Sequence, residues 1–360
     1  MNMKLTPIPN FSNLGVYVDD LDFQNLSVGE WVDLKNQLYS KYLLIIFRNA
    51  NLPLTDYATR MSQWGQHSNG LKYFFKKYNL PASEFYLKFS EGNLLPLYRH
   101  LYDVANKYNI SFDDLDIIEN SIGKIDKLSN SDSNLIVTRL KGKGATETNK
   151  PRDTNTVFLD GELAWHSDES MDLAFCDTIG LYGNNAMTAS ATGFVTTNRW
   201  YEDQSNSFRS ELDSMIAKHK YQPTKFNKNQ DPLEERIIAC QNGSDTGIPL
   251  VINSPGGFTG LHYPLNSVVG IVGMSESDSR SLFNYINKTL FVDENMYDHW
   301  YQQDNDLVLF DNSITLHRRL GSTINRVAYR TAWYLHEPTA DRYFQPEYQE
   351  KYQFILSEYN

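Results

Sequence analysis

The sequence predicts a mainly β fold with helices, of the α+β class, whose core is a sandwich or jelly roll. Short runs rich in β-branched and aromatic residues, separated by Gly, Asn and Asp, follow one another after about residue 135. Few helical intervals interrupt these runs, so strands and helices do not alternate as they do in a parallel βαβ fold. The predicted strands are Leu135–Thr138, Gly193–Thr197, Val268–Val272, Leu307–Phe310 and Val327–Leu335.

The N-terminal part predicts a helix, a buried strand and a second, short helix. Apolar residues recur at helical spacing over Leu26–Tyr42, and Ser27 and Glu30 form a capping-box pattern near its start. The uninterrupted apolar run Leu43–Phe47 is typical of a strand that is buried on both faces. A second helix is expected over Pro53–Trp64, because proline favours the first turn of a helix.

A helical insertion is expected at about residues 71–128. The Tyr- and Lys-rich stretches Lys72–Tyr78 and Leu97–Tyr102 differ from the β-rich part that follows. An amphipathic layer packed on a sheet, with its lysine ends in solvent, is the favoured interpretation. A lid or a partner surface is the functional alternative. Two further helices are predicted over Trp200–Ile216 and Ser275–Leu290.

Composition narrows the class of protein and its partners. The chain has no internal repeat or low-complexity linker, so residues 1–360 are expected to form a single domain. With 33 Lys and Arg against 44 Asp and Glu, the net charge of −11 argues against nucleic acid or an anionic membrane as partner. Two cysteines exclude a disulfide framework and favour a reducing cytoplasm, and no signal-peptide or membrane-spanning pattern is present. The sequence is compatible with a homo-oligomer and does not determine the oligomeric state.

Metal-ligand chemistry is indicated by histidines and one carboxylate. Of the eight histidines, His166 is followed two positions later by Asp168, and on a strand both side chains would share a face. His317 follows the Asp-Asn turn after the predicted strand Leu307–Phe310. Two imidazoles and one carboxylate can form a facial triad, which suits ferrous iron and leaves three positions open for a bidentate co-substrate and oxygen.

Two arginines follow the second histidine. Arg326 and Arg330 lie four residues apart on a predicted strand, with the small Ala328 between them. A guanidinium binds a carboxylate in a bidentate manner, so the pair favours an anionic co-substrate. The alternative is that one or both arginines pair with buried carboxylates or face solvent at a strand end.

Together these motifs resemble the TauD/TfdA-like family of iron(II)- and 2-oxoglutarate-dependent dioxygenases. The residues that carry the resemblance are Trp165-His166-Ser167-Asp168, Thr192-Gly193-Phe194-Val195, Arg199-Trp200-Tyr201-Glu202, Gly260-Leu261-His262-Tyr263-Pro264, Asp311-Asn312, His317, Arg326 and Arg330. The resemblance implies a double-stranded β-helix, a form of jelly roll. It also implies that His166, Asp168 and His317 bind Fe(II), which would react with 2-oxoglutarate and O2.

The resemblance also assigns roles around the metal. Arg326, helped by the Thr192 hydroxyl, would bind the distal carboxylate of 2-oxoglutarate. Arg330 would hold an anionic group of the substrate, or would instead support the co-substrate. Ser170 shares its predicted strand face with the first two ligands and is expected to line the pocket. His262 is expected to be a core histidine with satisfied hydrogen bonds.

The expected reaction is hydroxylation of an unactivated C–H bond in a small anionic or zwitterionic molecule, an amino acid, organic acid or sulfonate, with release of succinate and CO2. A carboxylate at Asp168 argues against halogenation, for which related enzymes have a small residue at this position. Desaturation, cyclisation and C–N or C–S cleavage at the same iron site are alternatives. A catalytically silent jelly roll that binds a metal is the alternative from another class.

Overall fold

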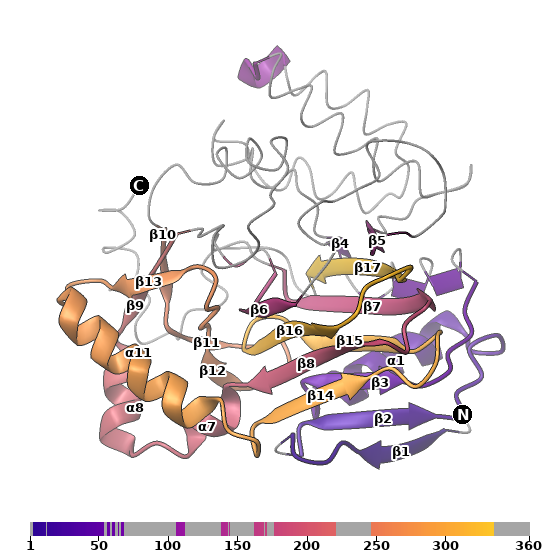
Figure 1. Cartoon of the computed structure of the whole chain (residues 1–360), viewed down its shortest axis with the longest axis horizontal. Helices are drawn as coiled ribbons and strands as arrows, with labels where there is room; N and C mark the ends of the chain where they lie inside the picture. Colours follow the sequence, from indigo (N-terminus) through magenta and orange to yellow (C-terminus); the bar gives the residue numbers. More distant parts are fainter. Residues whose placement is uncertain are drawn as a thin grey trace.

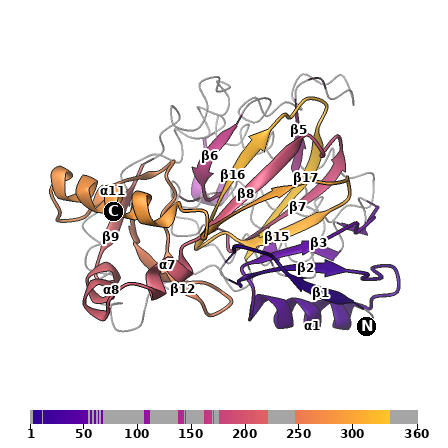
Figure 2. The ribbon, with the colours of Figure 1, turned by 60° about the horizontal axis from the view of Figure 1, so that its bottom comes forward.

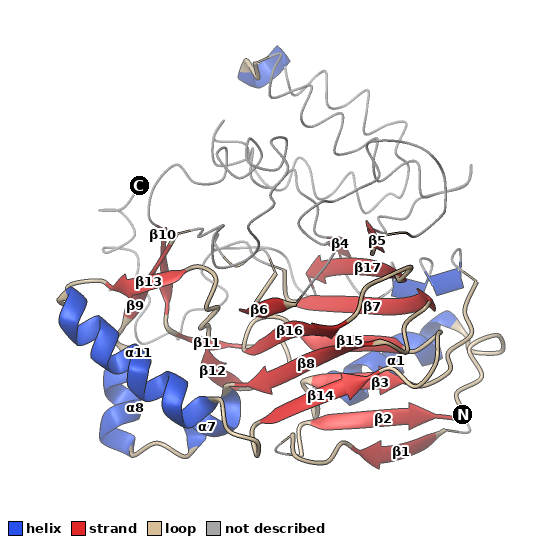
Figure 3. Ribbon diagram, in the orientation of Figure 1, coloured by secondary structure: helices blue, strands red, loops and turns tan. Residues whose placement is uncertain are grey.

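The computed structural model describes residues 3–11, 13–53, 56–57, 60–61, 64, 66–67, 106–111, 138–142, 144, 162–168, 170, 176–220 and 246–334. The helical insertion expected at about residues 71–128 lies outside the described residues except for 106–111. The described part is strand-rich with helices around it, which confirms the α+β class (Figures 1 and 3). None of its helices has the length and apolar character needed to cross a membrane.

The largest described sheet has eight strands. Its strand order is β1-β2-β3-β15-β7-β17-β4, and β5 pairs with β17. Strands β2 and β3 run parallel, and the other described pairs in this sheet are antiparallel. The strands are β1 (Lys4–Pro7), β2 (Gly15–Asp19), β3 (Leu44–Phe47), β4 (Gln66–His67), β5 (Thr138–Lys141), β7 (Thr178–Asn185), β15 (Leu307–Asp311) and β17 (Val327–Tyr334).

A four-stranded antiparallel sheet lies against the large one (Figure 2). It consists of β14 (Met296–Trp300), β8 (Ser190–Thr196), β16 (Thr315–Gly321) and β6 (Leu163–His166), in that order. Phe194 of β8 and Phe310 of β15 meet between the sheets, with ring centroids 5.1 Å apart. Both belong to one buried cluster, so the two sheets share a core.

The strand alternation explains why the large sheet is covered on both faces. In β15, Val308 and Phe310 point into the core shared with the smaller sheet, while Leu307 and Leu309 point to the opposite face. Helix α1 (Val28–Tyr39) packs on that opposite face (Figure 2). A strand buried on both faces needs apolar residues at every position, as the apolar run in β15 provides.

Helix α1 begins as its sequence predicts. Ser27 caps it by accepting from the backbone N–H of Glu30, and the Glu30 carboxylate accepts from the backbone N–H of Ser27. Trp31 is buried and stacks on Trp64, with ring centroids 4.4 Å apart. The capping box and the buried apolar stripe together confirm the helix and its start.

A third layer of helices and short strands packs on the outer face of the four-stranded sheet. Its apolar cluster includes Trp165, Val195 and Leu316 from that sheet. The elements of this layer are α7 (Asn198–Glu202), α8 (Asn206–Asp213), β9 (Ile216–His219), β10 (Thr246–Pro249), β11 (Val251–Asn253), β12 (Thr259–Leu261), β13 (Val268–Ile271) and α11 (Glu276–Leu290).

The structure differs from the helix predicted over Trp200–Ile216. Two helices, α7 and α8, replace it, because Ser205 adopts an extended conformation and caps α8 by accepting from the backbone N–H of Phe208. Ile216 already belongs to strand β9. By contrast, α11 confirms the second predicted helix, with Ser275 as its N-cap.

Candidate metal centre

His166 ends strand β6 and points into the space between the sheets. Its side chain is buried, and its Nδ1 lies 2.6 Å from the carbonyl oxygen of Ala164. Because a carbonyl only accepts, Nδ1–H donates, and Nε2 keeps its lone pair for a metal. Burial, together with the nearby His317, lowers the pKa of His166 to about 3, so the imidazole is neutral at physiological pH.

The strand neighbour of His166 points the other way. The Trp165 ring stacks on Phe291, with centroids 5.6 Å apart, and lies under the guanidinium of Arg318 at 4.4 Å. Trp165 is therefore a packing residue on the outer face, because consecutive residues of a strand point to opposite faces of the sheet.

Asp168 lies in the turn after β6, because this strand ends at His166. The expectation that His166 and Asp168 share a strand face is therefore wrong. Asn312 holds this turn: its Oδ1 accepts from the backbone N–H of Asp168 at 2.9 Å, and its Nδ2 donates to the Asp168 carbonyl at 2.8 Å. The side-chain amide of Asn312 thus bonds both the backbone N–H and the carbonyl of Asp168, which fixes the turn that carries the carboxylate.

His317 lies on β16, directly opposite His166 in the register of the two antiparallel strands. Directly opposed residues point to the same face of a sheet. The two imidazole rings accordingly face each other with centroids 4.0 Å apart, and Phe310 packs on the His317 ring at 4.7 Å. Cross-strand register therefore brings together two histidines that are 151 positions apart in the sequence (317 − 166).

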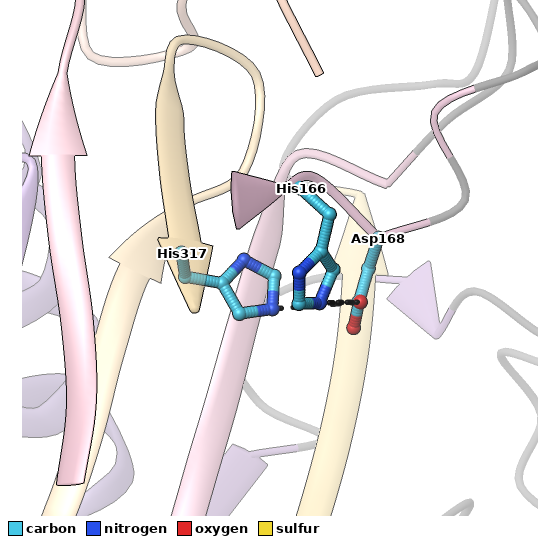
Figure 4. A group of neighbouring side chains, drawn as sticks. All are labelled: His166, Asp168 and His317. Atoms are coloured by element: carbon cyan, nitrogen blue, oxygen red, sulfur yellow. Dashed lines mark ion pairs between the residues drawn. The ribbon is translucent and has the colours of Figure 1, made fainter. Parts of the chain in front are cut away.

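The three side chains converge on one point (Figure 4). Oδ1 of Asp168 lies 3.6 Å from Nε2 of His166 and 3.5 Å from Nε2 of His317, and all three ligand atoms lie within 4.8 Å of one another. These separations are too long for hydrogen bonds. Ligands at right angles, each about 2.1 Å from a metal, would lie about 3 Å apart, so the site needs little adjustment to hold one.

Arg330 of β17 contacts the other oxygen of the same carboxylate. Its Nε donates to Oδ2 of Asp168 at 2.6 Å, and each of these side chains is 17% exposed. Burial raises the pKa of Asp168, but Arg330 and the two histidines hold it well below its usual range. Arg330 therefore keeps Oδ2 turned away from the point at which the three ligands meet and keeps the carboxylate ionised.

Arg326 directly precedes β17, and its side chain is buried. Its side chain forms no ion pair with any residue that the structure describes, and Nη1 is buried without a hydrogen bond. Burial lowers the pKa of Arg326, although a guanidinium remains charged at neutral pH. A buried cation without a counter-ion is costly, so this position favours an anionic ligand.

Thr192 lies in the same interior region as Arg326. The hydroxyl groups of Thr192 and Tyr301 are 3.1 Å apart, and the guanidinium of Arg326 lies 5.9 Å from the Tyr301 ring centre. The structure thus brings the two predicted co-substrate residues around one tyrosine. Neither a motif nor a spacing in the sequence singles out Tyr301, because it acts through contacts with distant residues.

Ser170 is buried in a different polar network. Its Oγ lies 3.3 Å from Oγ of Ser267, which in turn lies 3.0 Å from Nδ1 of His219. His262 is fully buried, and its Nδ1 donates to the carbonyl of Ser313 at 2.8 Å, which confirms it as a core histidine. Ser170 therefore lies close to Asp168 in sequence, but its hydroxyl bonds away from the three ligands.

Comparison with known proteins agrees with this geometry. The sequence matches the model of the family described as "Taurine catabolism dioxygenase TauD, TfdA family" over residues 5–332. No curated protein matches the chain.

Solved structures share the fold. AAD-2 in complex with Mn(II) and N-oxalylglycine aligns with a TM-score of 0.60 at 17% identity, covering 94% of this chain and 100% of that one. A taurine dioxygenase from Burkholderia xenovorans aligns with a TM-score of 0.56 at 15% identity, covering 92% of this chain and 90% of that one. At these identities the likeness shows the fold alone.

The family match spans most of the chain, and the ligand atoms of His166, Asp168 and His317 meet at one point inside the matched region. The chain therefore belongs to the TauD/TfdA family and is an Fe(II)- and 2-oxoglutarate-dependent dioxygenase.

Proposed function

We propose that this dioxygenase hydroxylates an unactivated C–H bond of a small anionic or zwitterionic molecule, such as an amino acid, an organic acid or a sulfonate. The main support is a three-ligand cluster in the same fold interior as the buried guanidinium of Arg326, which has no ion-pair partner among the described residues. When bound together with oxygen, iron and 2-oxoglutarate supply an oxidative decarboxylation to succinate and CO2 and the oxidation of the substrate.

His166, Asp168 and His317 are the proposed iron ligands. Support comes from the tautomer of His166, whose Nδ1–H donates to Ala164, and from Oδ1 of Asp168, which faces both Nε2 atoms. Neutral imidazoles and one carboxylate suit ferrous iron and leave one face of the metal open. The protein holds these groups in place before the metal binds, which limits the reorganisation on binding.

Arg326 and Thr192 are the proposed partners of the distal carboxylate of 2-oxoglutarate. Arg326 contributes a buried positive charge without a described counter-ion, and Thr192 contributes a buried hydroxyl. N-oxalylglycine, named with AAD-2, carries two carboxylates as 2-oxoglutarate does. The same chemistry is therefore proposed for the interior of this chain.

Arg330 and Ser170 are proposed to border the substrate pocket. Arg330 already pairs with Asp168 through Nε, and it is proposed to hold an anionic group of the substrate in addition to this carboxylate. The contribution of Ser170 is indirect: its side chain brings the polar network of Ser267 and His219 to within two residues of Asp168.

The fold is proposed to be a double-stranded β-helix within one domain spanning residues 1–360. The two sheets that share a core, one antiparallel and one antiparallel except for the β2–β3 pair, support this proposal. The helical insertion at about residues 71–128 is proposed to cover the pocket as a lid or to present a partner surface.

Desaturation, cyclisation and C–N or C–S cleavage use the same iron site, and product analysis separates them from hydroxylation. A silent metal-binding protein would form no succinate. Arg326 is buried and has no ion-pair partner in the part of the chain that the structure describes. This favours an active co-substrate site over a silent one, because such a charge is costly to keep without a ligand.

The test is anaerobic addition of Fe(II) and 2-oxoglutarate, observing the visible charge-transfer band of the chelate. The wild-type protein should develop the band and His166→Ala should not. Identical featureless spectra would rule out the iron site. Succinate formation is then measured against amino acids, sulfonates and betaines, and equal uncoupled turnover with all of them would argue against a small acidic substrate.

A further inference from the structure

Tyr301 connects the two residues assigned to the distal carboxylate of 2-oxoglutarate. It follows β14 by one residue and is almost fully buried. Its hydroxyl lies 3.1 Å from that of Thr192, and its ring lies 5.9 Å from the Arg326 guanidinium. The described part of the chain thus presents a Tyr-Thr-Arg group around an anion site that needs a ligand.

The direction of the Tyr301–Thr192 hydrogen bond follows from acidity. A phenol is the stronger donor of the two hydroxyl groups, and an anion near Thr192 demands a donor from the threonine. Burial raises the pKa of Tyr301, although Arg326 and Thr192 lower it, so the phenol keeps its proton at neutral pH. If Tyr301 donates to Thr192, the threonine O–H is free to donate to a carboxylate, and the two bonds strengthen each other.

The surroundings hold the Tyr301 ring in this position. His299 packs edge-on against it, with ring centroids 4.6 Å apart. His299 in turn lies opposite Thr192 in the β14–β8 register and contacts Asp306 through Nε2 at 3.2 Å. His299 therefore packs against the ring whose hydroxyl contacts Thr192.

We propose that Tyr301 is a positioning residue for 2-oxoglutarate: its hydroxyl orients the Thr192 O–H toward the distal carboxylate, and its ring shields Arg326 from water. This inference rests on the co-substrate site proposed above. It predicts that Tyr301 affects the binding of 2-oxoglutarate and leaves metal binding and the oxidation step alone.

The test uses Tyr301→Phe, which removes one oxygen atom and keeps the ring. Anaerobic titration of the Fe(II)-loaded enzyme with 2-oxoglutarate, followed by the charge-transfer band, should show a dissociation constant about 3- to 10-fold higher than in wild type. The KM for 2-oxoglutarate should rise similarly, while kcat at saturation and Fe(II) affinity stay unchanged. In Thr192→Val, adding Tyr301→Phe should cause little further loss, since the phenol acts through the threonine.

A matched control is Tyr297→Phe. Tyr297 lies on β14, which ends just before Tyr301, and its hydroxyl bonds that of Tyr17 and lies 3.4 Å from Nδ1 of His299. This variant should bind 2-oxoglutarate as the wild type does. A ligand control is 2-oxopentanoate, which has a methyl group in place of the distal carboxylate. Tyr301→Phe and wild type should bind it equally.

Three outcomes overturn the inference: an unchanged dissociation constant in Tyr301→Phe, an equal loss in Tyr297→Phe, or an equal loss with 2-oxopentanoate. The last two would mean that packing, and not the carboxylate, is affected. Absence of any band in the wild type would instead defeat the proposed co-substrate site itself, so the two failures are distinguishable.

Discussion

Replacing Asn312 by alanine should weaken both the fold and the metal centre. The Asn312 side chain is fully buried and bonds to chain segments 136 and 144 positions away. It accepts from the backbone N–H of Asp168, and its Nδ2 donates to the carbonyls of Asp168 and Cys176. Alanine removes all three of these hydrogen bonds.

The magnitude follows from the number of bonds lost. One buried and two part-buried hydrogen bonds, each contributing about 1 kcal/mol net, give an expected loss of about 3 kcal/mol in unfolding free energy. The turn that carries the Asp168 carboxylate is then free to move. Loss of such support typically reduces metal affinity by about 10- to 100-fold.

Two assays separate these effects. Urea unfolding gives the change in unfolding free energy, and titration with Mn(II), followed by EPR, gives metal affinity in conditions where circular dichroism shows a folded protein. Asn312→Ser is the milder variant if the alanine protein does not fold. The matched control is Asn198→Ala in the outer layer, where a buried amide donates to the carbonyl of Thr259 at 2.7 Å.

The control should lose stability and keep its metal affinity. If Asn312→Ala lost less than about 1 kcal/mol and bound Mn(II) as the wild type does, the amide would not hold the metal-ligand turn. Equal loss of metal affinity in both variants would show that general destabilisation is responsible.

Three other predictions concern charge and titration. His317→Ala should abolish the charge-transfer band of the Fe(II) and 2-oxoglutarate chelate, since one metal ligand is removed; retention of the band would assign that ligand elsewhere. Arg330→Gln should lower the unfolding free energy at pH 7 by about 2–4 kcal/mol, because it removes the cation that pairs with the largely buried Asp168 carboxylate. Arg318→Gln breaks the more exposed ion pair between Arg318 and Asp298 and should cost about 1 kcal/mol or less. Burial lowers the pKa of His262 to about 4 from an ordinary 6.5. Between these two pH values the imidazole is protonated in the unfolded chain and neutral in the folded chain. Stability should therefore fall as the pH drops from about 6.5 to about 4, by up to about 1.4 kcal/mol per pH unit, and His262→Asn should reduce that slope in urea unfolding; an unchanged slope would contradict the buried neutral imidazole.

Local patterns in the sequence were sufficient for several elements of the fold. The capping box at Ser27 and Glu30 lies within four residues. The uninterrupted apolar run that ends at Phe47 is sufficient to predict a strand buried on both faces. The prediction of one helix over Trp200–Ile216 was wrong, because the chain is interrupted at Ser205, which caps the start of a second helix. Elements were thus predictable where the deciding interaction is short-range.

In the candidate site, too, short-range contacts were predictable from the sequence and long-range contacts were not. His166 and Asp168 are two residues apart, so their proximity was expected from the sequence, although a turn and not a shared strand brings them together. The partner of Arg330 was left open between a substrate, a co-substrate and a buried carboxylate. The contact with Asp168 became visible only when β17 was placed beside the metal-ligand turn.

By itself, the sequence determined the chemistry available to this protein: two histidines, a carboxylate and two arginines in a strand-rich, acidic chain. Tertiary structure alone decided which of these groups meet. His317 opposes His166 through strand register, Asn312 holds the Asp168 turn, and Tyr301 reaches Thr192 across β14 and β8. The physical reason is that periodicity specifies which face a side chain occupies, whereas the partner on that face depends on pairings between strands more than a hundred residues apart.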